Sequence, residues 1–489
     1  MSHYEALRQR HVADAMALAP QLMAQLDWPA ERVAAHRSQR LRALVRFAVA
    51  RSPWHRQRLG GVDVDRLDAE SLRQLPAMTK TDLMDHFDQL VTDERLSLKL
   101  VNAHLDRVET NGYLLDRYSA IASGGSSGER GVFVYDWEGW AVFWLSCFRH
   151  LLRAKQSDAE FASRPLKVAW VMAGHLTHAT AALGRTFTGP NLTTFRFPVT
   201  LPIEEIVSGL NHAQPDCLNA YPSALNLLSF EAQAGRLRIN PRRIQSAAEP
   251  LLPEIRRAAE AAWGVRVGNL YGTSEGGGTA VPCDRRSTHL SEDLVIVEPV
   301  DEDGRPVAPG ERSAKIYLTN LYNRALPLIR YEITDEVTVL TEPCQCGSSM
   351  ASVADIQGRL DDMFFYDGRP VHPHLFRTAL SRRAAIVEYQ VRQTPSGAAI
   401  ALRCQGPVDF DGLVRELEQG LAHMGLERPK VTLMAVERLE RTDGPAKLKR
   451  FVPLPAAGGP ARRGRGCELP VAAGAAATSR GYLAARGAL

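Results

Sequence analysis

Between about residue 120 and residue 340, short β-rich runs alternate with amphipathic segments, and this alternation constrains the fold more than any other feature. The runs "GVFVY", "KVAWVMA" and "SAKIYLTNL" are typical of strands, while "EIRRAAEAAW" has apolar residues at helical spacing. The stretch "GPNLTTFRFPVTLPIEEIVSGL" fits a further strand, a loop and a helix. Such alternation predicts an α/β domain with a helix-covered, largely parallel sheet.

Two differently patterned regions flank this one. Residues 1–95 are expected to be helical, with Thr79 and Asp82 spaced as a capping box. After "GRLDDMF", two strands around the turn "PSG", a helix in "DFDGLVRELEQGLAHMGL" and a strand in "KVTLMAVERLER" predict a small α+β unit. We therefore expect a large N-terminal domain over 1–357, a small C-terminal domain over 358–455, and a disordered tail over 456–489.

Length, charge and hydropathy narrow the class of protein. A chain of 489 residues is too long for one hydrophobic core. The tail has five arginines and one glutamate, which accounts for the net charge of +4 and leaves the body neutral, so no nucleic-acid partner is expected. The sequence contains no run of 18 apolar residues, so no membrane span is expected. The N-terminus does not resemble a signal peptide. The expected compartment is the cytoplasm.

A glycine- and serine-rich stretch, "SGGSSGERG" (123–131), lies between two apolar runs. Backbone N–H groups of such a loop can wrap a phosphate, although an ordinary turn has the same composition. The lysine of a nucleotide-binding P-loop is absent, so a phosphate here needs its neutralising charge from elsewhere.

Four other stretches are ambiguous when taken alone. In "NLYGTSEGGG" (269–278) a tyrosine could stack on a purine and Glu275 could hold Mg²⁺, or the stretch could be a plain strand end. Asp335 in "LPLIRYEITDEV" could accept bonds from a ribose diol, or form a surface pair with Arg330. The stretch "GRLDDMFFYDGRPVHP" could be a polar loop before a hairpin. The stretch "RTDGPAKLKRF" could be a basic surface loop.

Together and in this order, the motifs resemble the adenylate-forming superfamily of acyl ligases, up to about Pro455. The closest likeness is to the phenylacetate–coenzyme A ligase branch, which includes amide-forming relatives of the coronafacic acid ligase type. The likeness rests on "LPAMTKTDLM", "SGGSSGERG", "YPSALNLL", "SAAEPL", "YGTSEGG", "PLIRYEITD", "CQCG" and "GRLDD". It implies a large α/β N-terminal domain with covered mixed sheets and a small, mobile α+β C-terminal domain.

The resemblance also implies a role for each matching residue. ATP phosphates would contact Ser123, Gly124, Gly125, Ser126, Ser127 and Gly128, and adenine would contact Ala247, Ala248, Glu249 and Pro250. Further implied roles are adenine stacking by Tyr271, α-phosphate binding by Ser274, Mg²⁺ binding by Glu275, and ribose binding by Asp335 with Arg359.

The resemblance answers the question of the missing cation. Lys447 in "GPAKLKRF" matches a lysine of the small domain that reaches the α-phosphate, with Asp361 as the hinge residue. Ala446 stands where glycine is usual, which leaves Lys449 as a rival. A cation on a mobile domain can be withdrawn after the first half-reaction.

Two further clusters are candidate sites. Cys283, His289, Cys344 and Cys346 match the ligand types of a tetrahedral structural zinc site, the alternative being free cysteines and a surface histidine. Zinc bound by four protein ligands has no open position for catalysis. An acyl pocket is expected at His175, His178, Tyr221 and Pro222, the alternative being a polar loop.

The sequence thus predicts an ATP- and Mg²⁺-dependent acid ligase that forms an acyl-AMP and pyrophosphate. "GER" replaces the "GKP" usual in thioester-forming relatives, and Asp367 places a carboxylate near the expected pantetheine path. Both departures favour an amino-acid amine as acceptor and an amide product, with coenzyme A and a thioester as the alternative. Glu275 and Lys447 argue against a non-catalytic binding protein, and the missing loop lysine argues against a P-loop NTPase.

Overall fold

An eight-stranded mixed sheet in the order β13-β9-β8-β7-β6-β5-β3-β4 forms the centre of the protein. The computed structural model describes residues 2–108, 112–123, 131–189, 191–249, 251–285, 287–354, 356, 364–383, 385–404, 406–437, 439 and 451–454. Neighbouring strands from β4 to β7 in this order are parallel, whereas the β7–β8, β8–β9 and β9–β13 pairs are antiparallel. The strands are β3 (Leu166–Met172), β4 (Leu192–Pro198), β5 (Cys217–Ala220), β6 (Arg243–Ala247), β7 (Val267–Thr273), β8 (Gly277–Pro282), β9 (Thr288–Leu290) and β13 (Ser352–Val353).

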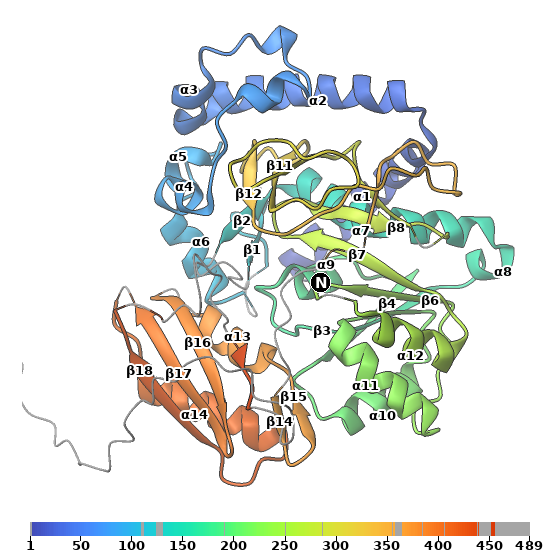
Figure 1. Cartoon of the computed structure of the whole chain (residues 1–489), viewed down its shortest axis with the longest axis vertical. Coiled ribbons are helices and arrows are strands. Elements are labelled where there is room, and N and C mark those ends of the chain that lie inside the picture. The colour runs from blue at the N-terminus through green and yellow to red at the C-terminus, as the bar shows by residue number, and fades with distance from the viewer. Residues whose placement is uncertain are drawn as a thin grey trace, which may run out of the picture. The chain divides into compact units, whose positions relative to one another are not determined.

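Helices cover both faces of this sheet, which confirms the expected α/β class (Figure 1). One face packs against α7 (Trp137–Ser157) and α9 (Ala179–Thr186). The other packs against α10 (Ile203–Ala213) and α11 (Pro222–Gln233), with α12 (Pro253–Trp263) beside α11. Burial on both faces explains why "KVAWVMA" is almost entirely apolar rather than alternating.

The N-terminal region is helical, as predicted. It contains α1 (His3–Ala24), α2 (Ala30–Arg51), α3 (Pro53–Leu59), α4 (Lys80–Asp85), α5 (Phe87–Leu90) and α6 (Leu98–Leu105), with short 3₁₀ turns η1 (Gln25–Asp27), η2 (Val64–Arg66) and η3 (Ser71–Gln74). The capping box is present, because the N–H of Asp82 donates to Thr79 Oγ1 (3.1 Å) and the N–H of Thr79 donates to Asp82 Oδ2 (2.7 Å). No helix among the described residues is long and apolar enough to cross a membrane.

Two smaller sheets accompany the central one. Strands β10 (Val295–Val300), β11 (Lys315–Asn320) and β12 (Tyr331–Ile333) are antiparallel neighbours. The segment before α4 lies against β12, because the N–H of Met78 donates to the Arg330 carbonyl and the Met78 carbonyl accepts from Glu332. Strands β1 (Ser119–Ala122) and β2 (Val132–Tyr135) form an antiparallel pair on either side of the glycine-rich stretch.

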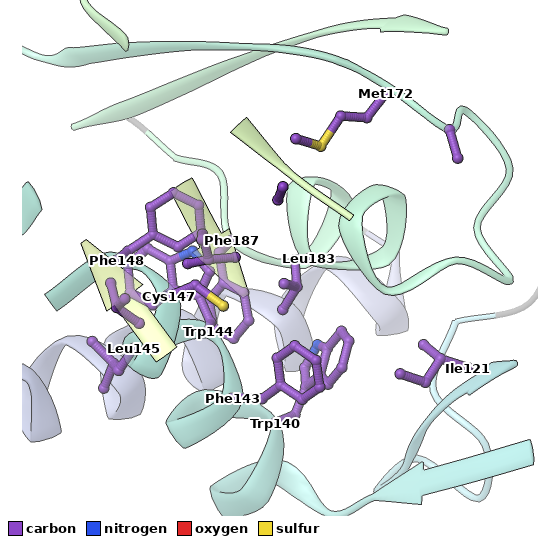
Figure 2. Packing of buried hydrophobic residues seen from close by; sticks show 14 of the residues in the cluster. Ile121, Trp140, Phe143, Trp144, Leu145, Cys147, Phe148, Met172, Leu183 and Phe187 are labelled. Atoms are coloured by element: carbon purple, nitrogen blue, oxygen red, sulfur yellow. The ribbon is translucent and has the colours of Figure 1, made fainter. Parts of the chain in front are cut away.

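Aromatic side chains of α7 belong to the hydrophobic core beside the sheet. Figure 2 shows Trp144 and Phe148 of this helix beside Phe187, and Trp140 and Phe143 as a second pair. The rings of Trp144 and Phe187 are stacked, with centroids 4.7 Å apart. A short helix, α8 (Ala159–Ala162), follows α7.

The close approach of α7 to β8 explains part of the glycine run in "YGTSEGGG". The N–H of Gly278 donates to Ser146 Oγ at 2.8 Å, and a Cβ at Gly278 would lie 2.8 Å from the Ser146 backbone. Gly277 has φ of 64°, a left-handed conformation that favours glycine. These two glycines therefore have a packing role in addition to any role near a ligand.

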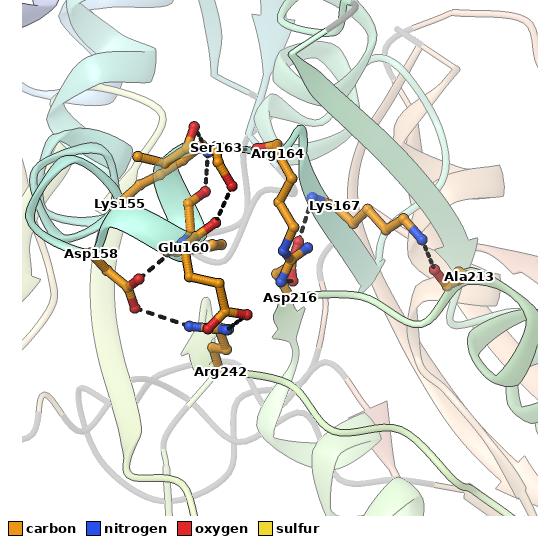
Figure 3. Close-up of polar contacts among 11 residues, drawn as sticks. Lys155, Asp158, Glu160, Ser163, Arg164, Lys167, Ala213, Asp216 and Arg242 are labelled. Atoms are coloured by element: carbon orange, nitrogen blue, oxygen red, sulfur yellow. Dashed lines mark hydrogen bonds and ion pairs between the residues drawn. The ribbon is translucent and has the colours of Figure 1, made fainter.

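Charged side chains hold the amino ends of the parallel strands in register (Figure 3). The Asp216 carboxylate, just before β5, accepts from Arg164 (2.5 Å) and from the N–H of Lys167 on β3 (2.9 Å). Arg242, just before β6, pairs with Asp158 (3.0 Å) and Glu160 (2.7 Å). Fixing the amino ends also fixes the register of the carboxyl ends, where the candidate site lies.

A smaller α+β region with its own hydrophobic core follows, as expected. It contains β14 (Phe364–Tyr366), β15 (Arg369–Val371), α13 (His374–Ser381), β16 (Ile386–Thr394), β17 (Gly397–Cys404), α14 (Phe410–His423), β18 (Lys430–Ala435) and β19 (Phe451–Val452). Its main sheet has the order β18-β17-β16-β19. Asp367 and Gly368 connect β14 to β15 with φ of 49° and 78°, the left-handed pair that an Asp-Gly hairpin turn requires.

Candidate active site

A cavity of about 180 Å³ lies at the carboxyl ends of the parallel strands, between the sheet and helices α7 and α9. Strand pairing sets Trp170, Asn219 and Gln245 side by side, and we call these three residues the inner row. Two residues further along the chain, Met172, Tyr221 and Ala247 form the outer row, nearer the strand ends. Both rows line the cavity, at the edge of an open α/β sheet where ligands usually bind.

Residues predicted to bind the nucleotide gather at the outer end of this cavity. Ala247, Ala248 and Ser274 line it, and Ala248 has φ of 68°. Nearby, the Tyr271 hydroxyl donates to Asp335 Oδ2 at 2.9 Å, across 64 positions of sequence. Burial, and secondarily the Asp335 charge, raise the pKa of Tyr271 well above its usual value, so it stays a neutral donor. The structure thus brings together two residues for which the sequence predicted adenine and ribose contacts.

The backbone that presents Ser274 and Glu275 is held by side-chain hydrogen bonds. Tyr135 donates to the Ser274 carbonyl (2.6 Å), and the Asn320 amide donates to the Glu275 carbonyl (2.7 Å). Glu275 is only 8% exposed, and burial raises the pKa of its carboxyl group despite the opposing charge of Lys80. A buried carboxylate in a fixed position has the chemistry of an Mg²⁺ ligand.

Lys80 is a cation near this site that sequence reasoning missed. It is the first residue of α4, directly after the Thr79 cap, and its charge acts on the Glu275 carboxyl group. The capping box predicts a helix start, but a lysine at that position has no spacing signature. The contact of Met78 with β12 brings it near Glu275.

The described part of the glycine-rich stretch is limited to its two ends. The N–H of Ser123 donates to the Gly131 carbonyl (2.8 Å), and the N–H of Gly131 donates to Ser123 Oγ (3.0 Å). Several predicted site residues lie outside the described residues, namely Gly124, Gly125, Ser126, Ser127, Gly128, Pro250, Arg359, Asp361, Lys447 and Lys449. Their assigned roles remain predictions.

The four residues expected in the acyl pocket divide into two pairs. His178 and Tyr221 line the cavity. His175 instead bonds Thr177 through Nδ1 (2.9 Å), and Pro222 is the buried first residue of α11; neither lines the cavity.

Two histidines of the smaller region, which the sequence did not single out, also contribute to the site. The ring of His374 stacks on Tyr221, with centroids 4.9 Å apart and planes at 7°, and lines the cavity together with Arg377. His372 Nε2 lies 3.0 Å from Glu249 Oε1 and 3.0 Å from Ser223 Oγ. Their segment "VHPHLF" follows the predicted hairpin, but nothing in its spacing indicated Tyr221 or Glu249 as neighbours.

The predicted zinc ligands converge. The ligand atoms of Cys283, His289, Cys344 and Cys346 all lie within 4.8 Å of one another. The sulfurs of Cys283 and Cys344 are 3.8 Å apart, the edge of a tetrahedron with metal–sulfur bonds of about 2.3 Å.

The hydrogen bonds made by the proposed ligands also suit a metal site. His289 Nδ1 bonds the Met350 carbonyl (2.8 Å), which leaves Nε2 directed at Cys346 Sγ (3.3 Å). Burial raises the pKa of Cys283 and of Cys346, whereas hydrogen bonds from Ser287 and the Cys346 N–H outweigh burial at Cys344 and lower its pKa to about 6. Thiolate is the form that binds metal.

Comparison with known proteins finds relatives of the kind that the motifs indicate. No protein-family model matches the chain. The phenylacetate-coenzyme A ligase of Thermus thermophilus is 27% identical over 385 residues, covering 74% of this chain and 78% of that protein. The enzyme of the same name from Pseudomonas putida is 26% identical over 390 residues, with the same coverage.

Solved structures agree on the fold. 2-Hydroxyisobutyryl-CoA ligase in the postadenylation state matches with a TM-score of 0.52 at 19% identity, covering 87% of this chain and 90% of that one. The same enzyme with 2-HIB-AMP and CoA in the thioesterification state matches with a TM-score of 0.54 at 19% identity, covering 87% and 91%. The chain is an ATP-dependent, AMP-forming acid ligase with the fold of these structures, and it is similar in sequence to the phenylacetate-coenzyme A ligases.

Proposed function

We propose that the enzyme activates an aromatic carboxylic acid as its acyl-AMP and transfers the acyl group to coenzyme A. The observation that supports this most directly is the cavity between the sheet and α7. Its walls include Phe143, Phe148 and Trp170, and it opens beside Ser274. Its volume of about 180 Å³ suits one ring with a short side chain, since an apolar cavity of roughly 150 Å³ can hold benzene.

In the first half-reaction, a carboxylate oxygen of the acid attacks the α-phosphorus of ATP, and the bond to the β-phosphate breaks to release pyrophosphate. Ser274 would bond the α-phosphate, Tyr271 and Asp335 would position adenine and ribose with Arg359, and Glu275 would hold Mg²⁺. Lys447 would place a positive charge where negative charge develops. The backbone of the glycine-rich loop would bind the departing phosphates.

In the second half-reaction, the thiol sulfur of coenzyme A attacks the acyl carbon and AMP leaves. The curated relatives named above are phenylacetate-coenzyme A ligases, and they favour this acceptor over the amine expected from Asp367. Asp367 is exposed at a hairpin turn, where solvent and salt screen its charge over about 8 Å. A screened carboxylate repels the coenzyme A phosphates only weakly, so it does not exclude coenzyme A as acceptor. The thioester alternative therefore replaces the amide prediction.

We also propose a zinc ion bound by Cys283, His289, Cys344 and Cys346. These residues join the β8–β9 connection to the loop before β13, so the ion would be structural. For the domains, we propose boundaries of 1–357, 358–455 and 456–489, with a hinge at Asp361.

The decisive experiment is product analysis by mass spectrometry after incubation with ATP, Mg²⁺ and a panel of aromatic and aliphatic acids. Each acid is tested with coenzyme A, with an amino-acid mixture, and with neither acceptor. The proposal expects pyrophosphate release with aromatic acids and acyl–coenzyme A as product. Amides formed in preference to thioesters, or turnover of aliphatic acids alone, would contradict it.

A further inference from the structure

Asn219 lies at the inner end of the cavity with an unpaired hydrogen-bond donor. Its side-chain nitrogen has no hydrogen-bond partner among the described residues, and the residue is only 4% exposed. Buried amide groups are nearly always paired, because an unpaired one is destabilising. This exception lies in the wall of a binding cavity, where a ligand can supply the partner.

The surroundings of this amide resemble a pocket for one ring. Asn219 stands between Trp170 and Gln245 in the inner row, and apolar side chains of α7 and α9 face it. Figure 2 shows Phe143, Cys147, Phe148 and Leu183 of these helices, together with Met172 of β3. The groups near the proposed α-phosphate contact, Thr273 and Ser274, line the outer end. An acid with its carboxyl group beside Ser274 would therefore extend its ring toward Asn219.

We infer that Asn219 donates a hydrogen bond to an oxygen substituent on the ring of the acid, so that hydroxylated aryl acids are preferred over unsubstituted ones. This inference rests on the proposed function, because it takes an aromatic acid as the occupant. A hydroxyl group suits the site because it accepts a bond from Asn219 and can donate one to the neighbouring Gln245. A site built around such a bond discriminates strongly against analogues that lack the oxygen.

A water molecule is the competing partner for the amide. A second cavity, of about 210 Å³, shares Cys147, Asn219 and Gln245 with the acid cavity and continues toward Arg243 and Arg266. Water entering from that side could satisfy Asn219 whatever the acid carries. In that case a hydroxyl group on the ring would bring no advantage.

The test compares kcat/KM for acid-dependent pyrophosphate release with phenylacetate and with its 4-methyl, 3-hydroxy and 4-hydroxy derivatives. The methyl compound matches the size of the 4-hydroxy compound without its polarity. We expect at least one hydroxy acid to exceed the methyl acid by about tenfold or more. Asn219→Leu, similar in size but apolar, should abolish this preference and leave the KM for ATP unchanged. Gln245→Met is the matched control and should keep most of the preference.

Equal kcat/KM for the hydroxy and methyl acids in the wild type would overturn the inference. So would a preference that survives Asn219→Leu, or one that only Gln245→Met removes. If Asn219→Leu is inactive, the shift in the midpoint of thermal unfolding caused by each acid reports binding without turnover. The hydroxy acids should then give larger shifts than the methyl acid in the wild type and no larger shifts in the variant. The proposed function fails by a different result, namely that no aryl acid supports pyrophosphate release. In that case the inference is judged by the thermal shifts alone, and equal shifts with the hydroxy and methyl acids would overturn it too.

Discussion

His372 Nε2 lies 3.0 Å from Oε1 of Glu249, so a residue of the smaller region pairs with one directly after the cavity-lining Ala247 and Ala248. The N–H of His374 donates to His372 Nδ1 (3.1 Å), which leaves Nε2 to donate its proton to Glu249. Burial raises the pKa of Glu249, but the His372 hydrogen bond and that from the Ser223 N–H outweigh it, and the net pKa is lowered. Glu249 is therefore ionised at neutral pH, and the hydrogen bonds from His372 and Ser223 stabilise its buried charge.

Replacing His372 with alanine is expected to destabilise the protein, because among the described residues Glu249 then keeps only the contact with Ser223. The loss should be about 1–3 kcal/mol in the free energy of unfolding, as for other buried groups that lose a partner. His372→Gln, which retains a donor, should recover part of the stability. Thermal unfolding of the two variants and the wild type measures these stabilities. If His372→Gln has the same midpoint as His372→Ala, the hydrogen bond is unimportant.

Lys447→Ala is expected to reduce acyl-AMP formation by about 10²- to 10³-fold, because a group that stabilises transition-state charge typically contributes that much. Lys449→Ala is the matched control and should remain within a fewfold of wild type. Acid-dependent pyrophosphate release measures both, with circular dichroism to confirm folding. A large loss in Lys449→Ala alone would move the role to that residue.

Removal of the proposed zinc is expected to lower the thermal midpoint, because a structural metal contributes to folding directly. Cys344→Ser should show less than one zinc per chain and a reduced midpoint, whereas Cys404→Ser, outside the cluster, should show neither change. Elemental analysis of protein purified without added metal checks the content. A wild-type protein without metal that is equally stable and active would exclude a structural role.

Stability is expected to fall as the pH decreases from about 6.5 toward 4, partly because of His55. Burial, opposed in part by a bond to the Pro327 carbonyl, lowers the pKa of His55 from 6.5 to about 4. Between these values the unfolded chain binds a proton that the folded protein does not. The contribution of neutral His55 to the free energy of unfolding is therefore complete above pH 6.5. It amounts to about 3 kcal/mol at most and is lost as the pH falls from 6.5 to about 4.

The matched variants for this effect are His55→Gln and His212→Gln. His212 is exposed, so its replacement should leave the pH dependence of the thermal midpoint unchanged. His55→Gln should be less stable at pH 7.5 but lose less stability between pH 7.5 and pH 5. An identical slope for all three proteins would exclude His55 as a source of the acid sensitivity.

The features that could be predicted from sequence were those set by local chemistry. The period of the apolar residues indicated the strands and helices, and the Thr79–Asp82 spacing indicated a cap. Resemblance to a family indicated that Tyr271 and Asp335 serve one ligand, and they are hydrogen-bonded across 64 positions.

Other features depend on contacts between distant segments, which have no local signature. Lys80 looks like any helix-terminal lysine until its segment docks on β12. Asn219 looks like a polar residue in a strand until the register places it beside Trp170 and beneath α7. The pairing of His372 with Glu249 requires two regions that have separate hydrophobic cores. In each case packing, rather than composition, decides which atoms meet.

The two rows of the sheet have a consequence for how such ligases diversify. Side chains on one face of a parallel strand recur about every 6.6 Å, so one strand can present an acid-facing residue and then a nucleotide-facing one. Gln245 and Ala247 on β6 have this relationship. After gene duplication, substitutions in the inner row can change which acid is accepted. Ala247, the outer-row residue proposed to contact a nucleotide common to every copy, can meanwhile remain under selection unchanged.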